Sequence, residues 1–151
     1  MKMKKIINRR AKFDYQFFKR LETGIALTGA EVKSVKAGHI KLAGSFVRIH
    51  NGEIWLHNAY ISPYAYADNR DYEPSRARKL LLHKKELINL EQQIKEKNLT
   101  IIPISCYTKH RRIKLEIALA RGKKKYEKRE AIKKRDLERE ANLGMLGIDR
   151  N

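Results

Sequence analysis

The clearest pattern in the chain is an alternation of hydrophobic and polar residues on both sides of Asn51-Gly52. Asn-Gly between two alternating segments is typical of a hairpin with a two-residue type I′ turn. This turn fixes the register, so we expect Arg48 to face Trp55 and Ile49 to face Ile54. The buried face of this hairpin is then predicted to consist of Val47, Ile49, Ile54 and Leu56.

Three further segments have patterns that favour β-strands. Residues 13–27 are aromatic and apolar, and an interruption at Gly24 predicts two strand segments joined by a bend. Residues 99–107 and 112–119 are predicted to form two more strands, joined by a basic turn at 109–111. In the last strand one face carries Ile113, Leu115, Ile117 and Leu119, and the other carries Arg112, Lys114 and Glu116.

Two segments have helical patterns. Thr28 and Glu31 have the spacing of a capping box, which predicts a short helix at about residues 30–37, ended by Gly38. Its exposed side would carry Lys33 and Lys36. Residues 84–98 are predicted to form an amphipathic helix whose apolar stripe is Leu87, Leu90 and Ile94, widened by Ile88.

Two segments lack periodicity. Residues 1–12 form a basic arm that we expect to need no order without a partner. Residues 62–79 are predicted to form a long polar loop that ends in the basic cluster 76–79. Long loops in compact domains are often functional.

About six strands, two helices and no βαβ alternation predict a mainly β fold with flanking helices. An antiparallel sheet closed into a small barrel, like the oligonucleotide-binding barrel, fits this order of elements. We expect residues 1–120 to form this body and residues 121–151 to form a separate basic tail.

The tail is defined by its charge. Nine Lys or Arg and only two acids, Glu127 and Glu130, lie between Arg121 and Arg135. A helix that is polar nearly all round buries little, so we expect the tail to be disordered when free and helical against an anionic surface. A solvated C-terminus is the plainer interpretation. The charge imbalance favours nucleic acid.

The composition of the whole chain points the same way. Its 151 residues carry a formal net charge of +18 and a pI near 10.1, which favours a polyanionic partner. Membrane is the rival polyanion, but the sequence has no apolar run of transmembrane length and its N-terminus lacks the apolar stretch of a signal peptide. We therefore expect a cytoplasmic protein that binds no membrane. The one cysteine, Cys106, lies in a strand pattern and is predicted to be a small core residue.

Catalytic and metal-binding patterns are weak. The five histidines are scattered, none has metal-site spacing, and the sequence has no Gly-rich phosphate loop. We therefore expect no enzyme activity, no cofactor and no metal. His50 and His57 share one hairpin face and resemble a nuclease pair, although such histidines are more often surface residues. A structural RNA protein, such as a ribosomal protein, is a further alternative.

The polar face of the hairpin allows two interpretations. Phe46, Arg48, Trp55 and His57 together are typical of a surface that stacks single-stranded bases. Alternatively, Arg48 and Trp55 form a cross-strand cation–π pair beneath a helix. The sequence leaves the two open.

Five motifs in order resemble those of the small protein B family, the bacterial partner of transfer-messenger RNA in trans-translation. The motifs are at 8–11, 29–38, 61–64, 78–87 and 120–124, and the resemblance extends from about Asn8 to about Arg139. It implies a non-enzymatic, monomeric RNA chaperone whose barrel binds the tRNA-like domain of transfer-messenger RNA. With elongation factor Tu, and with alanyl-tRNA synthetase engaged through the RNA, the complex would rescue stalled ribosomes. The tail would lie in the decoding centre and the vacant mRNA channel.

The resemblance also implies functional positions. In the body they are Asn8, Arg9, Arg10, Lys12, Glu22, Lys33, Lys36, Leu81 and Lys114, and in the tail Gly122, Lys123, Lys124, Tyr126, Lys128 and Arg129. Glu22 would accept hydrogen bonds from base amino groups or 2′-hydroxyls, and Lys114 would contact phosphate. Leu81 lies in an apolar triplet, so we expect it in the core. An aromatic ring at Tyr126 would stack on an unpaired base.

The sequence departs from the family pattern at two places in the tail. Glu127 stands where the family commonly has Asp. Gly144 and Gly147 weaken helix continuation, so we expect the tail helix to stop near Leu143.

Overall fold

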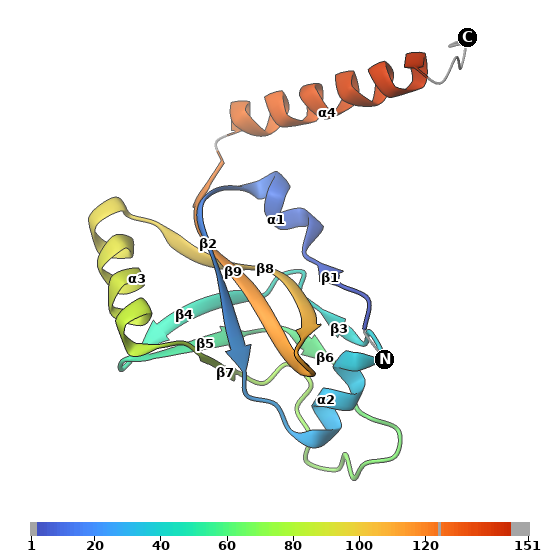
Figure 1. Ribbon diagram of the computed structural model, residues 1–151, viewed down its shortest axis with the longest axis vertical. Helices are drawn as coiled ribbons and strands as arrows, with labels where there is room; N and C mark the ends of the chain where they lie inside the picture. Colours follow the sequence, from blue (N-terminus) through green and yellow to red (C-terminus); the bar gives the residue numbers. More distant parts are fainter. Residues whose placement is uncertain (1–2, 124, 146–151) are drawn as a thin grey trace.

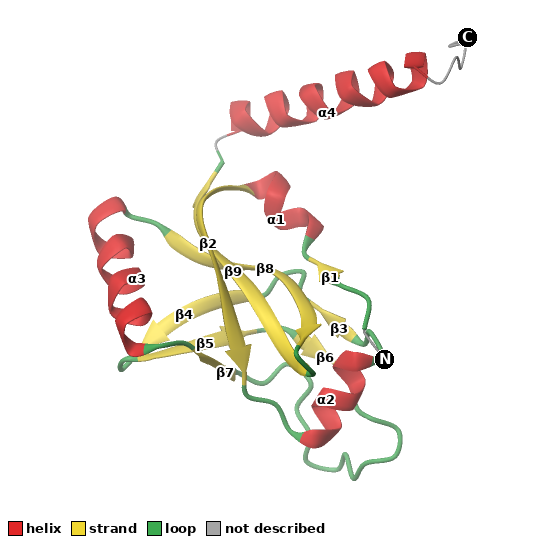
Figure 2. Ribbon diagram, in the orientation of Figure 1, coloured by secondary structure: helices red, strands yellow, loops and turns green. Residues whose placement is uncertain are grey.

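The computed structural model describes residues 3–123 and 125–145 (Figure 1). In chain order the elements are β1 (Ile6–Ile7), α1 (Arg9–Asp14), β2 (Tyr15–Ile25), α2 (Gly29–Lys36), β3 (Ile40–Lys41), β4 (Phe46–His50), β5 (Glu53–His57), β6 (Tyr60–Ile61), β7 (Arg78–Leu81), α3 (Lys84–Lys97), β8 (Thr100–Lys109), β9 (Arg112–Gly122) and α4 (Lys125–Met145). Helices α1, α2 and α3 lie around the strands, and α4 extends away from them (Figure 2).

Six antiparallel strands close into a barrel. Neighbouring strands pair in the order β8-β4-β5-β7-β2-β9. The barrel closes because the last strand, β9, pairs with the first, β8, along nearly its whole length. Closure leaves no long free edge on these strands. The predicted closed antiparallel barrel with flanking helices is therefore confirmed. Its interior is filled by apolar side chains that include Val47, Leu56, Leu80, Leu115 and Ile117.

The predicted hairpin is confirmed in its turn and its register. Asn51 and Gly52 have φ angles of 51° and 72°, as a type I′ turn requires. Arg48 pairs with Trp55, and Ile49 pairs with Ile54. On the predicted inner face, Val47, Ile54 and Leu56 are buried and Ile49 is half-buried.

Helices α2 and α3 also form as predicted. The Thr28 hydroxyl accepts a hydrogen bond from the Glu31 backbone N–H, and the Glu31 carboxylate accepts one from the Thr28 N–H. In α3, Leu87 and Leu90 are buried, but Ile88 is 54% exposed and does not widen the apolar stripe. Asn98 ends α3 in the left-handed conformation with φ 51°.

From residue 3 onward the N-terminal arm, for which we expected no order without a partner, packs on the barrel. The backbone N–H of Asn8 donates to the Ile104 carbonyl at 2.7 Å, and its side-chain amide donates to the Pro103 carbonyl at 3.0 Å. Ala11 of α1 is buried in a second apolar cluster on β8 and β9. The arm therefore covers an outer face of the barrel that the sequence pattern did not reveal.

Strand β2 is continuous, whereas we predicted two segments. It runs from Tyr15 to Ile25, and Gly24 pairs on both sides, with Leu81 of β7 and Lys114 of β9. The glycine therefore marks no bend here. Phe13 belongs to α1 rather than to the strand.

The predicted 62–79 loop ends early, because Arg78 begins β7. Arg78 is fully buried, and its guanidinium has five hydrogen-bond donors. These donors reach the Glu31 carboxylate at 2.8 Å, the Tyr72 hydroxyl at 3.1 Å and the carbonyls of Ala59, Pro74 and Arg76. This network fixes the loop against α2.

Burial affects the pKa values of two side chains, Cys106 and Glu31. Cys106 is fully buried, and burial raises the pKa of its thiol to about 12, so it is a core residue as predicted. Burial also raises the pKa of Glu31, but bonds from Arg76, Thr28 and Arg78 outweigh it and hold that pKa at about 2. Glu31 therefore stays ionised in the folded chain at neutral pH.

The tail is helical from Lys125 to Met145, the form expected for its bound state. The last helical residue lies two positions beyond the predicted stop at Leu143. Fraying of the free tail stays a prediction. At its base, the Lys128 ammonium lies 3.3 Å from the Asp14 carboxylate, and the Lys123 backbone N–H donates to the Asp14 carbonyl at 2.8 Å. No helix within 3–123 or 125–145 has the length and hydrophobicity to cross a bilayer.

Candidate nucleic-acid interface

Three sequence-predicted residues meet on one outer wall of the barrel. Gly24 of β2 lies between Leu81 of β7 and Lys114 of β9, paired with both. Residues directly opposite one another in an antiparallel sheet project from the same face. Glu22 lies two residues before Gly24 on the same strand and face. The register therefore brings Glu22, Leu81 and Lys114 together, although the chain separates them widely.

Gly24 allows a close approach of Leu81 on this wall. A Cβ atom at this position would lie 3.1 Å from the Leu81 Cβ, closer than ordinary van der Waals contact. Beside this close approach lies a groove with a cavity volume of about 770 Å³. Its lining includes Glu22, Leu81, His83, Arg111, Arg112 and Lys114. We call this the Glu22 groove.

The Glu22 carboxylate is held in place but not saturated. It accepts a hydrogen bond from the Tyr107 hydroxyl, and the Lys109 ammonium lies 3.6 Å from it. The Tyr107 bond, opposed by some burial and helped by Lys109 and Lys114, keeps the pKa of Glu22 below its ordinary value. A carboxylate has about four lone-pair sites, so it can still accept hydrogen bonds from a ligand.

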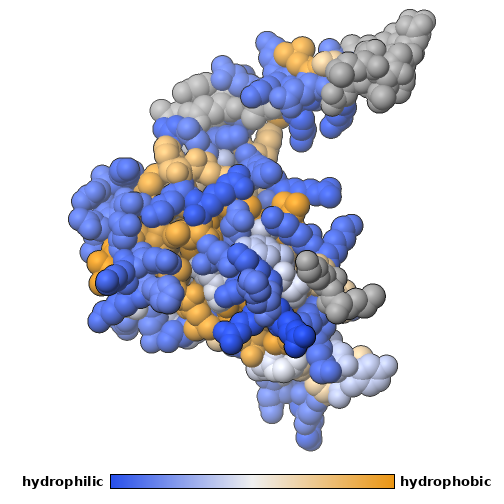
Figure 3. Space-filling model, in the orientation of Figure 1, coloured by the Kyte–Doolittle hydropathy of each residue, from blue (hydrophilic) through white to orange (hydrophobic). Residues whose placement is uncertain are grey.

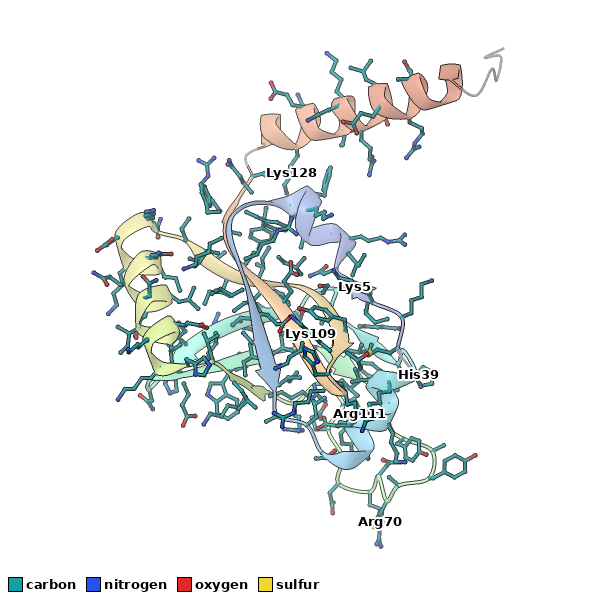
Figure 4. All side chains as sticks on the ribbon, viewed as in Figure 1. Lys5, His39, Arg70, Lys109, Arg111 and Lys128 are labelled. Atoms are coloured by element: carbon teal, nitrogen blue, oxygen red, sulfur yellow. The ribbon has the colours of Figure 1, made fainter. Side chains whose placement is uncertain are left out.

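Basic side chains lie around Glu22, although a second acid, Glu86, also lines the groove. Lys109 and Arg111 lie at the β8–β9 turn, beside the C-terminal end of β2 (Figure 4). The two residues between the strands have left-handed backbone, with φ angles of 52° at His110 and 66° at Arg111. The ammonium of Lys5 lies 5.3 Å from the centroid of the Tyr107 ring, which brings the N-terminal arm to the same site. The groove therefore offers an oriented acceptor inside a cationic rim, which suits RNA hydroxyls and phosphates.

We predicted that Leu81 lies in the core, and the structure shows that this is wrong. Its side chain is 53% exposed at the edge of the Glu22 groove, while its neighbour Leu80 is 1% exposed. The apolar triplet misled the prediction because strand residues alternate between faces. An exposed leucine at a groove edge is available to contact a ligand.

The other predicted residues of the body lie on two helices at different ends of the barrel (Figure 1). Lys33 and Lys36 are exposed on α2, whose Val32 lines the groove. Arg9, Arg10 and Lys12 are exposed on α1, beside the base of the tail. Asn8 is 9% exposed and anchors the arm to β8, and its contact with RNA stays a prediction.

The predicted tail residues begin inside the barrel sheet. Gly122 of β9 pairs with Tyr15 of β2, and the Lys123 ammonium donates to the Lys12 carbonyl at 3.0 Å. Lys128 and Arg129 follow in the first turns of α4. Lys124 lies outside the described residues, and of Tyr126 only the helical backbone is described.

The outer face of the β4–β5 hairpin lacks the predicted cation–π contact between Arg48 and Trp55. The Arg48 guanidinium lies 4.9 Å from the centroid of Phe46, so its cation–π partner is on its own strand rather than Trp55. His57 pairs with Phe46 and His50 pairs with Glu53, four residues apart along each strand. This spacing is about 13 Å, too far for two histidines to act on one bond.

Most of the surface seen in Figure 3 is hydrophilic, with hydrophobic patches over the sheet. In the described part of the chain, no three His, Cys, Asp or Glu side chains gather as metal ligands would. The surface chemistry is therefore that of cations and a few oriented acceptors.

Comparison with known proteins agrees with this chemistry. The family model described as SmpB protein matches residues 5–145 of the chain. The chain belongs to the SmpB family. The SsrA-binding protein of Sulfurihydrogenibium sp. (strain YO3AOP1) is 51% identical over 140 residues, covering 93% of this chain and 92% of the relative. That of Persephonella marina is 52% identical with the same coverage.

A solved structure of an SmpB-family chain also matches. It is described as "tmRNA-SmpB: a journey to the center of the bacterial ribosome". That chain is 45% identical, with a TM-score of 0.66 over 80% of this chain and 85% of its own. The barrel described above is therefore shared with an SmpB of known structure.

Sequence reasoning missed several residues of the groove in this SmpB-family chain. Tyr107 orients Glu22, and Arg111 and Arg112 line the rim. The basic turn at 109–111 was visible in the sequence, but nothing local showed that it would reach β2. Tyr107 gave no signal, because its partner lies 85 residues earlier.

Proposed function

We propose that this chain binds the tRNA-like domain of transfer-messenger RNA through the Glu22 groove and delivers it to stalled ribosomes for trans-translation. The observation that carries the proposal is the convergence of Glu22, Leu81 and Lys114 around Gly24. The proposal is supported by membership of the SmpB family and by relatives named as SsrA-binding proteins.

In this mechanism the groove supplies placement and the cations supply affinity. Glu22 accepts hydrogen bonds from base amino groups or 2′-hydroxyls, which no phosphate-binding lysine recognises. Lys114 and the basic β8–β9 turn neutralise phosphates, and exposed Leu81 packs against a sugar or base. Because each phosphate contact releases counterions, the affinity falls steeply with salt.

The tail acts at the second partner, the ribosome. Helix α4 starts at the α1 end of the barrel, away from the groove end where α2 and the β8–β9 turn lie (Figure 1). A chain held to its RNA at the groove end leaves α4 unobstructed. We propose that α4 lies in the decoding centre and the vacant mRNA channel, with Gly122, Lys123, Lys124, Tyr126, Lys128 and Arg129 at its beginning.

The remaining partners follow from the RNA. Elongation factor Tu and alanyl-tRNA synthetase would join through the tRNA-like domain, and the chain would act as a monomer in the cytoplasm. Purification distinguishes this function from that of a structural ribosomal protein. Capture of a tRNA-like RNA supports the proposal, whereas stable residence in vacant ribosomal subunits would contradict it.

The decisive variant is Glu22→Gln. It removes a negative charge, so general electrostatics alone would tighten RNA binding. Loss of charged hydrogen bonds instead predicts binding of the tRNA-like domain about ten- to a hundredfold weaker. The matched control is Glu96→Gln, which removes the same charge from an exposed site on α3. Equal effects of the two variants would refute the groove as the binding site.

A further inference from the structure

The outer face of the hairpin forms a second aromatic and basic surface. Three cross-strand pairs line it: Phe46 with His57, Arg48 with Trp55, and His50 with Glu53. The Phe46 and His57 rings stack with centroids 5.2 Å apart and planes 13° from parallel. The Arg48 guanidinium lies near the Phe46 ring, 4.9 Å from its centroid, on the same strand. We call this surface the Trp55 shelf.

The shelf is hollowed and accessible. Its residues other than Phe46 line a cavity with a volume of about 550 Å³, within the range of small-ligand sites. The lining comes from the hairpin and from Ala77. Phe46 is 37% exposed, Arg48 is exposed, and the Trp55 ring is half-buried. Aromatic faces that remain open to solvent beside an arginine can accept a further flat ring.

The charge around Trp55 is positive. Trp55 pairs with Arg48 on one side and with Lys79 of β7 on the other, so a cation flanks the ring on each neighbouring strand. The acid of the shelf, Glu53, has its carboxylate 3.5 Å from the Lys79 ammonium. Aromatic surface between two cations is the combination that holds unpaired bases and their phosphates.

The shelf is continuous with the Glu22 groove through β7. On this strand Lys79 borders Trp55, and Leu81 borders Gly24. The two residues project from the same face and are two positions apart, about 6.6 Å along the strand. A nucleic acid strand that leaves the groove would reach the shelf directly.

We propose that the Trp55 shelf stacks unpaired bases of single-stranded RNA. The chemistry of the shelf carries this inference alone, while its use together with the groove rests on the proposed function. The stacked Phe46 and His57 rings and the Trp55 ring offer flat surfaces, and Arg48 and Lys79 offer contacts to phosphate. Such stacking tolerates any base sequence.

The chain offers a reporter for this site, because Trp55 is its one tryptophan. The full-length protein is titrated with an oligouridylate of about eight nucleotides while the indole fluorescence is followed. The cationic tail also attracts the oligonucleotide, but only binding at the shelf quenches Trp55. We expect saturable quenching.

Two variants and a control sharpen the measurement. Phe46→Leu and Arg48→Gln, both at exposed positions, should each raise the Kd from quenching by about fivefold or more. Phe18→Leu removes a ring that is 54% exposed elsewhere on the barrel and should leave the Kd unchanged. Absence of quenching, or quenching that both shelf variants retain in full, would overturn the proposal.

The outcomes separate this inference from the proposed function. An oligonucleotide that binds by anisotropy without quenching Trp55 is held elsewhere, and the shelf is then free for a protein contact instead. That result refutes the shelf, but the effect of Glu22→Gln on the tRNA-like domain is measured independently.

Discussion

At the scale of residues, position and exposure together distinguish the side chains that we propose to bind RNA from those that hold the fold. Leu81 and Ile88 are both about half exposed, yet only Leu81 borders the Glu22 groove. Glu22 and Glu31 are both acids with lowered pKa, but Glu22 faces the groove and Glu31 is 1% exposed. The sequence predicted the position of Glu22 only through family resemblance. It gave no sign of the Glu31–Arg78 pair, because the partners are 47 residues apart.

Replacing Leu81 by Ala tests whether this side chain acts by contact or through the fold. Because the residue is exposed, we expect the free energy of unfolding to change by about 0.5 kcal/mol or less. Loss of the apolar contact should weaken binding of the tRNA-like domain by about fivefold. Denaturant titration and RNA titration measure the two quantities. Ile88→Ala is the matched control, with no expected effect on binding; a marked loss of stability in Leu81→Ala would restore the core interpretation.

The groove floor can be tested at Gly24. In Gly24→Ala the added Cβ would meet the Leu81 Cβ at 3.1 Å, so Leu81 must shift. We expect RNA affinity to fall while the fold is kept, at a cost of about 1–3 kcal/mol in stability. Gly29→Ala is a suitable control, because nothing lies within 4 Å of a Cβ there. Unchanged RNA affinity in Gly24→Ala would show that the hollow is not used.

The buried pair predicts a pH dependence of stability. The folded-state pKa of Glu31 is about 2, below its ordinary value of 4.5, so ionisation favours the folded state. This stabilisation is complete above pH 4.5 and is lost as the pH falls from there towards 2. Glu31→Gln should lower the free energy of unfolding at neutral pH by about 3 kcal/mol, because Arg78 is left buried without its counter-charge.

Thermal unfolding at about pH 6 and about pH 3 checks this prediction. The gap in Tm between the parent chain and Glu31→Gln should narrow at the lower pH. Glu96→Gln, at an exposed position on α3, should show little gap at either. A Tm difference between the parent chain and Glu31→Gln that widens on acidification would contradict stabilisation by ionised Glu31.

At the scale of elements, local signals were reliable where one side of an element faces the core. The Asn51-Gly52 turn, the capping box of α2 and the left-handed Gly38 after α2 all formed near their predicted positions. The failures included β7 and the arm with α1. Both depend on distant partners: Arg78 needs Glu31, and Ala11 packs on β8 and β9. No local pattern encodes those contacts.

The tail helix is the element whose stability is most open to test. Its large apolar side chains among the described residues, Ile132 and Leu137, are 37% and 60% exposed, so little burial stabilises it. We expect circular dichroism of the full chain, minus that of a chain ending at Lys123, to show partial helix without RNA. Adding structured RNA should increase the helix content of the tail in this difference spectrum. An unchanged difference spectrum would refute coupled folding.

At the scale of the whole molecule, we propose that the two ends of the barrel have different tasks. One end carries the Glu22 groove, α2 and the basic β8–β9 turn, and the other carries α1 and the base of α4 (Figure 1). The net charge of +18 indicated a polyanionic partner but not this division. In this proposal, the folded arrangement separates the surface that holds the RNA from the helix that acts on the ribosome. We expect tagging of stalled peptides to be abolished in a chain that ends at Lys123, which keeps β9 intact.

The most direct test of this division is the Kd for the tRNA-like domain of transfer-messenger RNA at about 0.15 M salt. It is measured for the full chain, the Glu22→Gln variant and the chain ending at Lys123. We predict that the shortened chain binds within about threefold of the full chain, while Glu22→Gln binds about tenfold more weakly or worse. Strong loss of affinity in the shortened chain, with Glu22→Gln unaffected, would contradict the account.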